Sequence, residues 1–216
     1  MTEQQLEEFW NNKRQKNVIA YTGRAIPKKD QLGNATLQER VQIDVKTMLT
    51  DNDALVQNLA AQHNLKGRTH DETMWNIQKF VVQNLKYIGD DLSNCTMEYW
   101  QFPFETIADR TGDCEDGALL IAALAINIGV PSFRVRVVAG MVQPAPTAPQ
   151  GGHGYVSYLR ESDNQWVVID WCYLEDSRLT VAEKQLHKLN EYYKDVWFSF
   201  NNQYSWSDQP ISFTSF

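Results

Sequence analysis

The chain has 216 residues, of which 43% are hydrophobic and 12% aromatic, enough to build the core of one compact domain. Its formal net charge of -7 disfavours contact with a phosphate backbone, so we expect no nucleic-acid partner. The longest apolar run, 118–126, is far shorter than the roughly twenty residues that span a bilayer, so we also expect no membrane partner.

The amino terminus and the cysteine content both favour a cytoplasmic location. The first ten residues, MTEQQLEEFW, lack the basic start and apolar stretch of a secretory signal. The three cysteines, at 95, 114 and 172, are odd in number and form no CxxC pair, which fits a reducing compartment. We therefore predict a cytoplasmic protein in which Cys95 is a small buried hydrophobe.

Helical patterns dominate the first part of the chain. We expect a helix near 3–16 followed by an arm, and further helix over 36–64, where apolar residues recur at helix spacing. A capping-box pattern, Thr69-x-x-Glu72, then opens a long amphipathic helix. We assign 1–65 to an N-terminal helical extension packed on the core.

Residues 66–175 are predicted to form the core. An irregular connection over 89–112 contains a short helix near 104–110 and is long enough to suggest a functional loop. Asp113 opens a helix whose body, 118–128, is apolar on nearly every side and is therefore buried. Strand candidates follow at 132–142, 153–160 and 166–173. Helices followed by an antiparallel sheet predict an α+β fold.

Residues 176–216 are predicted to complete the same domain. The pattern favours a helix over 180–193. The aromatic tail from 196 to 216 is expected to pack on the body as an added strand or a clasp.

The motif Gly112-Asp113-Cys114-Glu115-Asp116 places a thiol in the first turn of the buried helix, where the helix dipole favours a thiolate. Part of the motif is equally explained as a helix cap. The three acidic neighbours oppose ionisation, and the dipole is worth only about 0.3–1 kcal/mol, less than one pKa unit. Cys114 therefore needs a positive partner, which a histidine commonly supplies.

His153 and Asp170 are the candidates for the other two members of a catalytic triad. His153 lies between glycines at the mouth of a predicted strand, although a lone histidine is commonly a surface or satisfied core residue. Asp170 ends an apolar strand, where a carboxylate needs a partner unless it reaches solvent. An imidazole that it orients would be that partner.

The stretch from Tyr87 to Trp171 resembles the transglutaminase-like cysteine peptidases of bacteria and their phages. The shared features, in order, are Tyr87-Ile88-Gly89-Asp90, Tyr99-Trp100-x-x-Pro103-x-Glu105-Thr106, Gly-Asp-Cys-Glu-Asp, Gly-His-Gly before a strand, and Val-Ile-Asp ending the next strand.

This resemblance implies a papain-like core, in which the cysteine helix packs on the antiparallel sheet. It implies Cys114 as nucleophile, His153 as base and Asp170 as the group that orients the base. It covers neither 1–65 nor 175–216.

The register of one hairpin bears on the triad. His153 and Asp170 lie opposite each other only if the loop is centred between Glu161 and Ser162, whereas the turn residues Asp163-Asn164 would move Asp170 four positions away. We expect a longer loop, or a bulge beginning near Arg160, to reconcile the two.

An oxyanion hole would combine the Cys114 N–H with a side-chain donor near the helix start. Trp100 and Gln101 are the candidates, and the resemblance favours Trp100, although either could simply pack.

The proline-rich segment before His153 predicts either a lid or a passive hairpin tip. Its residues are Pro144, Pro146, Pro149, Gly151 and Gly152.

We expect no cofactor or metal, because Cys114, His153, Asp170 and Cys172 match no zinc spacing. Residues 90–118 hold eight acidic groups against one basic residue, Arg110. If these acidic groups face outward, the approach to Cys114 is negative and favours basic or amine substrates.

These observations predict a cysteine-dependent amide hydrolase, a peptidase or amidase, that acts on a protein or peptide through a thioester. Transfer of the acyl group to an amine, as in a transglutaminase, is one alternative, and a non-catalytic binding protein with the same fold is the other. The sequence predicts no oligomeric state.

Overall fold

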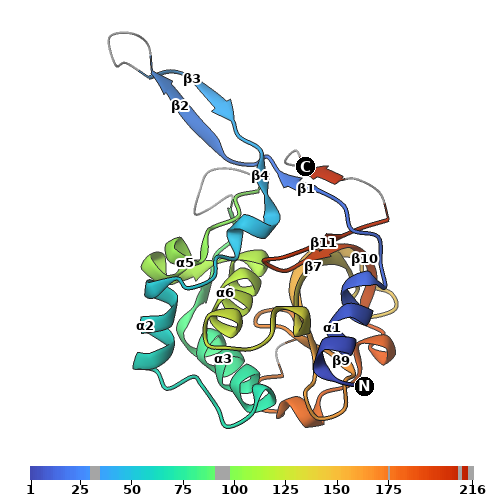
Figure 1. The fold of residues 1–216 in the computed structure, drawn as a ribbon. Coiled ribbons are helices and arrows are strands. Elements are labelled where there is room, and N and C mark those ends of the chain that lie inside the picture. Colours follow the sequence, from blue (N-terminus) through green and yellow to red (C-terminus); the bar gives the residue numbers. More distant parts are fainter. Residues whose placement is uncertain (30–34, 91–97, 175, 209–210, 214–216) are drawn as a thin grey trace.

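The computed structural model describes residues 1–29, 35–90, 98–174, 176–208 and 211–213. Most of these residues form one body, from which a two-stranded hairpin projects (Figure 1). The hairpin pairs β2, Ala25–Lys29, with β3, Ala35–Arg40. At its base, β1, Ile19–Tyr21, lies between β12, Ile211–Phe213, and β4, Ile43–Asp44.

Local capping signals explain where several helices begin. Thr2 and Gln5 form a capping box at the start of α1, Glu3–Asn12. Asp53 caps α2, Ala54–Gln62, and Thr69 caps α3, His70–Asn84. Within the described residues, the remaining α-helices are α5, Pro103–Asp109, and α6, Cys114–Asn127. 3-10 turns cover Val45–Met48, Ser132–Arg134, Val181–Glu183 and His187–Leu189.

A five-stranded antiparallel sheet has the order β11-β10-β7-β8-β9. Its strands are β7, Val135–Val142; β8, Gly151–Leu159; β9, Trp166–Ile169; β10, Tyr193–Phe200; and β11, Ser205–Trp206. A short parallel pair, β5 (Lys86–Tyr87) with β6 (Thr111–Gly112), lies just before α6.

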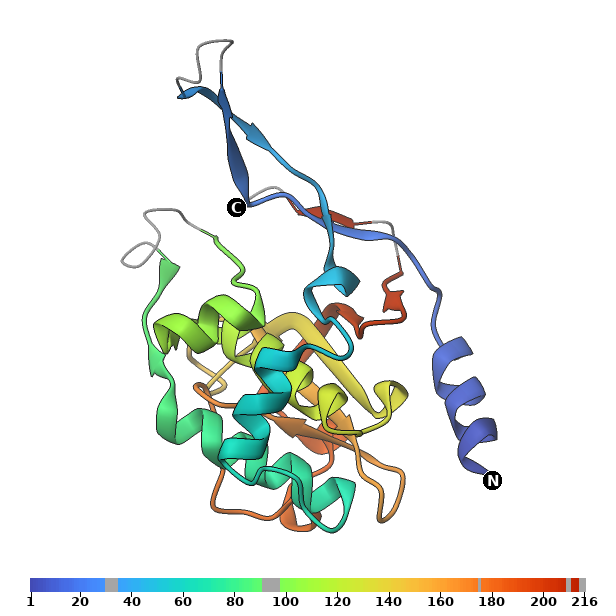
Figure 2. The ribbon, with the colours of Figure 1, turned by 60° about the vertical axis from the view of Figure 1, so that its left-hand side comes forward.

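Helix α6 lies at the centre of the body, between the sheet and helices α2, α3 and α5 (Figure 2). Every residue from Glu115 to Ala125 is buried. Because the body of α6 is apolar on all sides, the helix is stable only when other elements pack on every side of it. The predicted α+β fold, with a buried cysteine helix on an antiparallel sheet and a helix at the N-terminus, is confirmed.

The expectation of helix over 36–64 is wrong for its first half. This segment contains β3, β4 and a 3-10 turn, and only α2 is an α-helix. Strand pairing with β2 and β1 fixes the backbone here, and such distant partners leave no trace in the local periodicity. The first helix is also shorter than expected, because it ends at Asn12 and Lys16 bridges to Trp206.

The expected helix over 180–193 is also wrong. The segment forms two 3-10 turns and then enters β10 at Tyr193. Tertiary contacts keep this segment from forming an α-helix. Lys184 is buried beside Asp176, and the His187 ring lies between Ser157 and Tyr155. The aromatic tail does add a strand, but β10 lies inside the sheet rather than at its edge. Within this tail, Phe216 lies outside the described residues.

None of the helices in the described ranges is long and apolar enough to cross a bilayer.

The β8–β9 hairpin resolves the register question differently from either alternative. Val156 pairs with Ile169, and the Arg160 N–H closes the loop on the Gln165 carbonyl at 3.0 Å. The loop is thus longer than two residues, as expected, and the pairing runs without a bulge through these two strands. Extended by one residue, this register places Asp170 diagonally from His153 on the same face, within reach of two side chains of this size.

Candidate active site

His153 and Asp170 form a buried pair on the sheet. His153 Nε2 lies 2.6 Å from Asp170 Oδ2, and both side chains are almost fully buried. With Nε2 engaged by the carboxylate, the other ring nitrogen, Nδ1, is the one left to exchange a proton with a nucleophile.

Three O–H and N–H groups also donate to Asp170. The Tyr193 hydroxyl donates to Oδ2 at 2.7 Å, and the N–H groups of Cys172 and Tyr173 donate to Oδ1 at 3.1 and 3.3 Å. Burial raises the pKa of Asp170, but the hydrogen bond and charge of His153, with the Tyr193 and Cys172 donors, outweigh it and leave the pKa below its ordinary value. Asp170 is therefore held as a carboxylate.

Tyr193 is a site residue that the sequence did not reveal. It opens β10 and pairs with Val142 of β7. The aromatic richness of the tail was visible in the sequence, but the placement of β10 beside β7, which brings Tyr193 to Asp170, depends on long-range pairing.

Cys114 is the first residue of α6, capped by Asp113 and Asp116. Two parts of the sheet pack on this turn. Trp171 Nε1 donates to the Cys114 carbonyl at 3.2 Å, and the N–H of Gly154 is directed at the Cys114 thiol. A side chain at position 154 would lie 2.9 Å from the Glu115 Cα, so the close approach requires glycine. The residue before this contact is His153, so the part of β8 that carries His153 packs against the first turn of α6.

The Cys114 thiol is protonated and hydrogen-bonded to a neighbouring carboxyl group. Cys114 Sγ donates to Glu115 Oε2 at 3.0 Å. Burial, followed by the charges of Glu115 and Asp113, raises the pKa of Cys114 well above its ordinary value. The helix terminus therefore does not ionise the thiol by itself, as the sequence indicated.

A cluster of carboxyl groups surrounds the start of α6. Ligand oxygens of Asp90, Glu98 and Glu115 lie within 4.8 Å of one another, and so do those of Asp90, Asp113 and Asp116. Burial raises the pKa of Asp113 to about 6 and that of Asp116 to about 8, in both cases aided by neighbouring carboxylates. We refer to these five residues as the carboxyl cluster.

The carboxyl cluster fits a hard cation. The pKa of Glu115 is raised well above its ordinary value by burial and then by Asp113, whose carboxyl group shares a hydrogen bond with that of Glu115. Carboxyl groups buried against one another must share protons or a cation, and oxygen ligands suit Ca²⁺ or Mg²⁺. This set differs from the cysteine and histidine set considered for zinc, of which His153, Asp170 and Cys172 lie together.

The acidic residues of 90–118 do not all face outward. Asp90, Glu115 and Asp116 are buried, and Glu105 pairs with Arg24. A preference for basic substrates was predicted only if these acidic groups face outward, and these four residues do not meet that condition.

Trp100 and Gln101 lie immediately beside the start of α6, because the Gln101 N–H donates to Asp116 Oδ1 at 2.7 Å. The Trp100 ring packs between Tyr21 and the aromatic residues of β10, and its Nε1 donates to Glu98 at 2.5 Å. Gln101 is buried, and its Oε1 accepts no hydrogen bond from the described residues.

The proline-rich segment forms the tip of the β7–β8 hairpin. Gln143 Nε2 donates to the carbonyls of Pro146 and Ala148, which closes the loop on itself. Gly151 and Gly152 belong to β8, and Gly152 lies against the Trp197 ring. Pro144 and Pro149 lie within the exposed loop. This geometry is compatible with a lid or with a passive tip.

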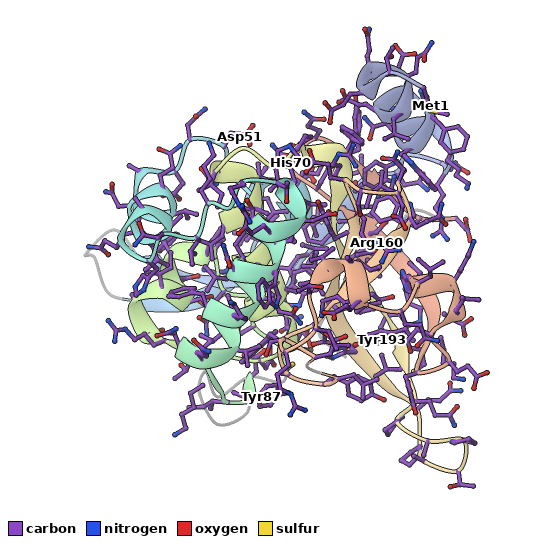
Figure 3. All side chains as sticks on the ribbon, turned by 90° about the horizontal axis from the view of Figure 1, so that it is seen from below. Met1, Asp51, His70, Tyr87, Arg160 and Tyr193 are labelled. Atoms are coloured by element: carbon purple, nitrogen blue, oxygen red, sulfur yellow. The ribbon has the colours of Figure 1, made fainter. Side chains whose placement is uncertain are left out.

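Tyr87 contributes an exposed aromatic wall beside the cysteine. Its ring lies 5.8 Å from that of Trp171, and its pKa is raised by burial and then by Cys114. In Figure 3, Tyr87 and Tyr193 lie toward the same end of the molecule, and Met1 lies toward the other.

The sequence matches the family described as "Transglutaminase-like domain" over residues 55–174, more than half of its length. The chain therefore belongs to the transglutaminase-like domain family. No curated protein sequence matches it significantly.

Among solved structures, EGTA-treated LapG from Legionella pneumophila is similar at a TM-score of 0.53 and 20% identity, covering 72% of this chain and 84% of LapG. A second LapG structure gives 0.53 and 20%, over 71% and 86%. Calcium-bound LapG gives 0.47 and 21%, over 71% and 86%. At such identities the first two likenesses show a shared fold.

Proposed function

We propose that this chain is a cysteine-dependent amide hydrolase that acts on a protein or peptide substrate. The observation that carries the proposal is the buried His153–Asp170 pair, with a 2.6 Å contact. The residues that follow them, Gly154 and Trp171, pack against the first turn of α6, which begins with Cys114. Cys114 is the nucleophile, His153 the general base and acid, and Asp170 the group that orients the imidazole.

In the first step His153 takes the thiol proton, and Cys114 Sγ attacks the carbonyl carbon of the scissile amide. The imidazolium then protonates the leaving amine as the C–N bond breaks, which leaves a thioester. In the second step His153 takes a proton from water, the hydroxide attacks the thioester carbonyl, and the thiolate departs with the acid product. Asp170, held ionised by its donors, stabilises the imidazolium in both steps.

The developing oxyanion needs two donors. The Cys114 N–H is one. Gln101 is the better side-chain candidate, because the Trp100 indole N–H is already engaged by Glu98. The amide of Gln101 lies beside the helix start, fixed through the bond from its own N–H to Asp116.

Acyl transfer to an amine remains the alternative activity, because it differs only in the molecule that reaches the thioester. A non-catalytic binding protein is the other alternative. The ionised, fully partnered Asp170 argues for catalysis, since an orienting carboxylate buried beside a histidine is costly without a use.

The carboxyl cluster is proposed to hold a calcium ion. In this chain Asp113, Glu115 and Asp116 would provide oxygen ligands, and a cation there supplies positive charge close to the thiol. With its oxygens bound to the cation, Glu115 would no longer accept the hydrogen bond from Cys114 Sγ.

Trapping tests the proposed hydrolase directly. The chain is incubated with a cell lysate and an amine-bearing probe, with and without calcium, and modified proteins are identified by mass spectrometry. Substrates cleaved or probe-labelled by the wild type, spared by Cys114→Ala and processed normally by Cys172→Ala support the proposal. Hydrolysed ends indicate a hydrolase, and probe-labelled ends indicate transfer to amines. Products that persist in Cys114→Ala would refute it.

The cytoplasmic location stays a prediction from the cysteine content, and Cys95, on which part of it rests, lies outside the described residues. The division at 65 and 175 also stays a prediction.

A further inference from the structure

A groove lies on the face of the sheet opposite α6, away from the Cys114 helix. It is a groove of about 710 Å³ between α1, the His187–Leu189 turn and the outer face of β7, β8 and β10. Its volume is in the range of about 300–1,000 Å³ that is typical of ligand sites. We call it the outer groove.

The charge of the outer groove is opposite to that of the whole chain. Five side chains that line it are basic, namely Lys13, Arg14, Arg136, Lys188 and Lys194. No Asp or Glu lines it among the described residues. In a chain of net charge -7, this is a local concentration of positive charge rather than a reflection of composition.

Aromatic rings, not carboxylates, contact two of these cations. Lys13 Nζ lies 4.4 Å from the centre of the Trp10 ring, and the Arg136 guanidinium lies 5.0 Å from that of Trp166 and 3.9 Å from that of Trp206. A cation–π contact orients a cation without neutralising it. The positive charge therefore stays available to a ligand.

Arg136 is the clearest sign that an anion is missing. Arg136 is 7% exposed and donates a hydrogen bond to the Trp10 carbonyl at 2.7 Å, while its Nε has no partner among the described residues. Burial, and then the nearby Arg14, lowers the pKa of Arg136 to about 9. A buried guanidinium without a carboxylate is costly, and a bound anion would remove that cost.

One residue of the outer groove, Tyr193, connects it to the candidate active site. Tyr193 lines the groove, and its hydroxyl donates to Asp170 Oδ2 at 2.7 Å. Figure 3 shows the side of the molecule on which Tyr193 lies, with Met1 marking the far end of α1. A segment of substrate bound along the groove would thus be held next to the sheet that carries His153 and Asp170.

We infer that the outer groove binds an acidic segment of a protein substrate, rich in Asp and Glu, as an exosite for the proposed hydrolase. The inference rests on the proposed function for its role, but the binding itself can be measured without turnover. An extended acidic peptide suits a groove that is lined by cations, aromatic rings and the amides of Asn164, Gln165 and Asn190. The negative charge of the rest of the surface opposes longer polyanions.

Binding is tested with a fluorescein-labelled peptide of eight glutamates and Cys114→Ala protein, by fluorescence anisotropy. The groove variant Arg14→Glu/Lys188→Glu changes two exposed side chains of the groove. The matched control, Lys66→Glu/Arg178→Glu, makes the same charge change at two exposed positions that do not line the groove. Peptides of eight glutamines, and ATP as competitor, test the ligand class.

We expect saturable binding of the glutamate peptide, weakened at least tenfold in the groove variant, changed less than twofold in the control, and weakened by salt. Three results would overturn the inference: no binding of the glutamate peptide, equal weakening in both double variants, or groove-dependent binding of ATP that the peptide fails to displace. Cys114 alkylation in the groove variant, with Cys114 intact, separates the two proposals. If Cys114 reacts normally but the glutamate peptide does not bind, the groove proposal fails and the hydrolase proposal is unaffected. If the peptide binds but Cys114 is unreactive, the hydrolase proposal fails and the groove proposal is unaffected.

Discussion

Asp170 carries a charge in the interior of the protein because four groups surround it. His153 and Tyr193 share its Oδ2, and two backbone N–H groups approach its Oδ1. Cys114 is in the opposite situation, since burial and two acidic neighbours hold its proton in place. The candidate site thus combines an ionised Asp170 with a Cys114 thiol that holds its proton.

Tyr193→Phe tests the positioning of Asp170. The variant loses a hydrogen bond to a charged group, worth about 1.5–3 kcal/mol, so kcat/KM is expected to fall about tenfold or more. Because one donor to the carboxylate is lost, the pKa of Asp170 rises, and the acid limb of the pH–rate profile moves to higher pH. Tyr192→Phe, which changes the exposed neighbour, is the control. An acid limb that stays in place would show that Tyr193 does not act through Asp170.

At the scale of elements, the first turn of α6 is fixed by close contacts with the sheet. A methyl group at Gly117 would lie 2.1 Å from Trp171 Nε1, the atom that donates to the Cys114 carbonyl. Gly154 meets Glu115 in the same way from β8. Two glycines therefore set the distance between the cysteine helix and the strands that carry His153 and Asp170.

Gly117→Ala is expected to destabilise the protein, although alanine is the better helix former. Overpacking against Trp171 costs about 1–3 kcal/mol, which exceeds the propensity gain of about 0.8–1 kcal/mol. The Tm in thermal unfolding should fall by roughly 2–4 °C per kcal/mol. Gly151→Ala, where no atom lies within 4 Å of the added methyl, serves as the control. A higher Tm in Gly117→Ala would mean that the Trp171 side chain moves away from the added methyl group at little cost in free energy.

Elements with strong local signals could be predicted from the sequence. The Thr69 cap, the buried α6 and the strands β7 to β9 lie close to their expected places. The misassigned segments, 36–48 and 180–193, are those in which distant partners decide the backbone.

The candidate site divides in the same way. Cys114, His153 and Asp170 were proposed from short motifs, each ambiguous alone. The diagonal register that joins His153 to Asp170 lies between the two registers considered, because the hairpin loop spans Arg160 to Gln165. Tyr193 and the carboxyl cluster depend on chain segments far apart in sequence, so local patterns could not reveal them.

At the scale of the whole molecule, we expect the carboxyl cluster to couple stability to pH and, through the proposed calcium site, to calcium. Asp113 and Asp116 have folded-state pKa values of about 6 and about 8, above those of an unfolded chain. Between about pH 4 and 8 the folded state therefore binds more protons than the unfolded state, and its stability falls as the pH rises.

In EGTA, the Tm is accordingly expected to be lower at pH 8 than at pH 5.5. Calcium replaces these protons, so it should raise the Tm more at pH 8 than at pH 5.5, by about 2.7 kcal/mol of stability at one hundred times its Kd. Calorimetry with Asp113→Asn/Asp116→Asn as comparison checks this. A calcium response that is equal in this variant, or absent from the wild type, would contradict the cation proposal.

The most direct test of the central claim is the alkylation of Cys114 by iodoacetamide as a function of pH, with calcium present, followed by mass spectrometry of each cysteine. The account predicts that Cys114 reacts well below pH 8, faster than Cys172, whose own pKa is raised by burial and Asp170, and that His153→Ala removes this reactivity. Reaction of Cys114 no faster than that of Cys172, with or without calcium, would contradict a Cys-His-Asp mechanism in this chain.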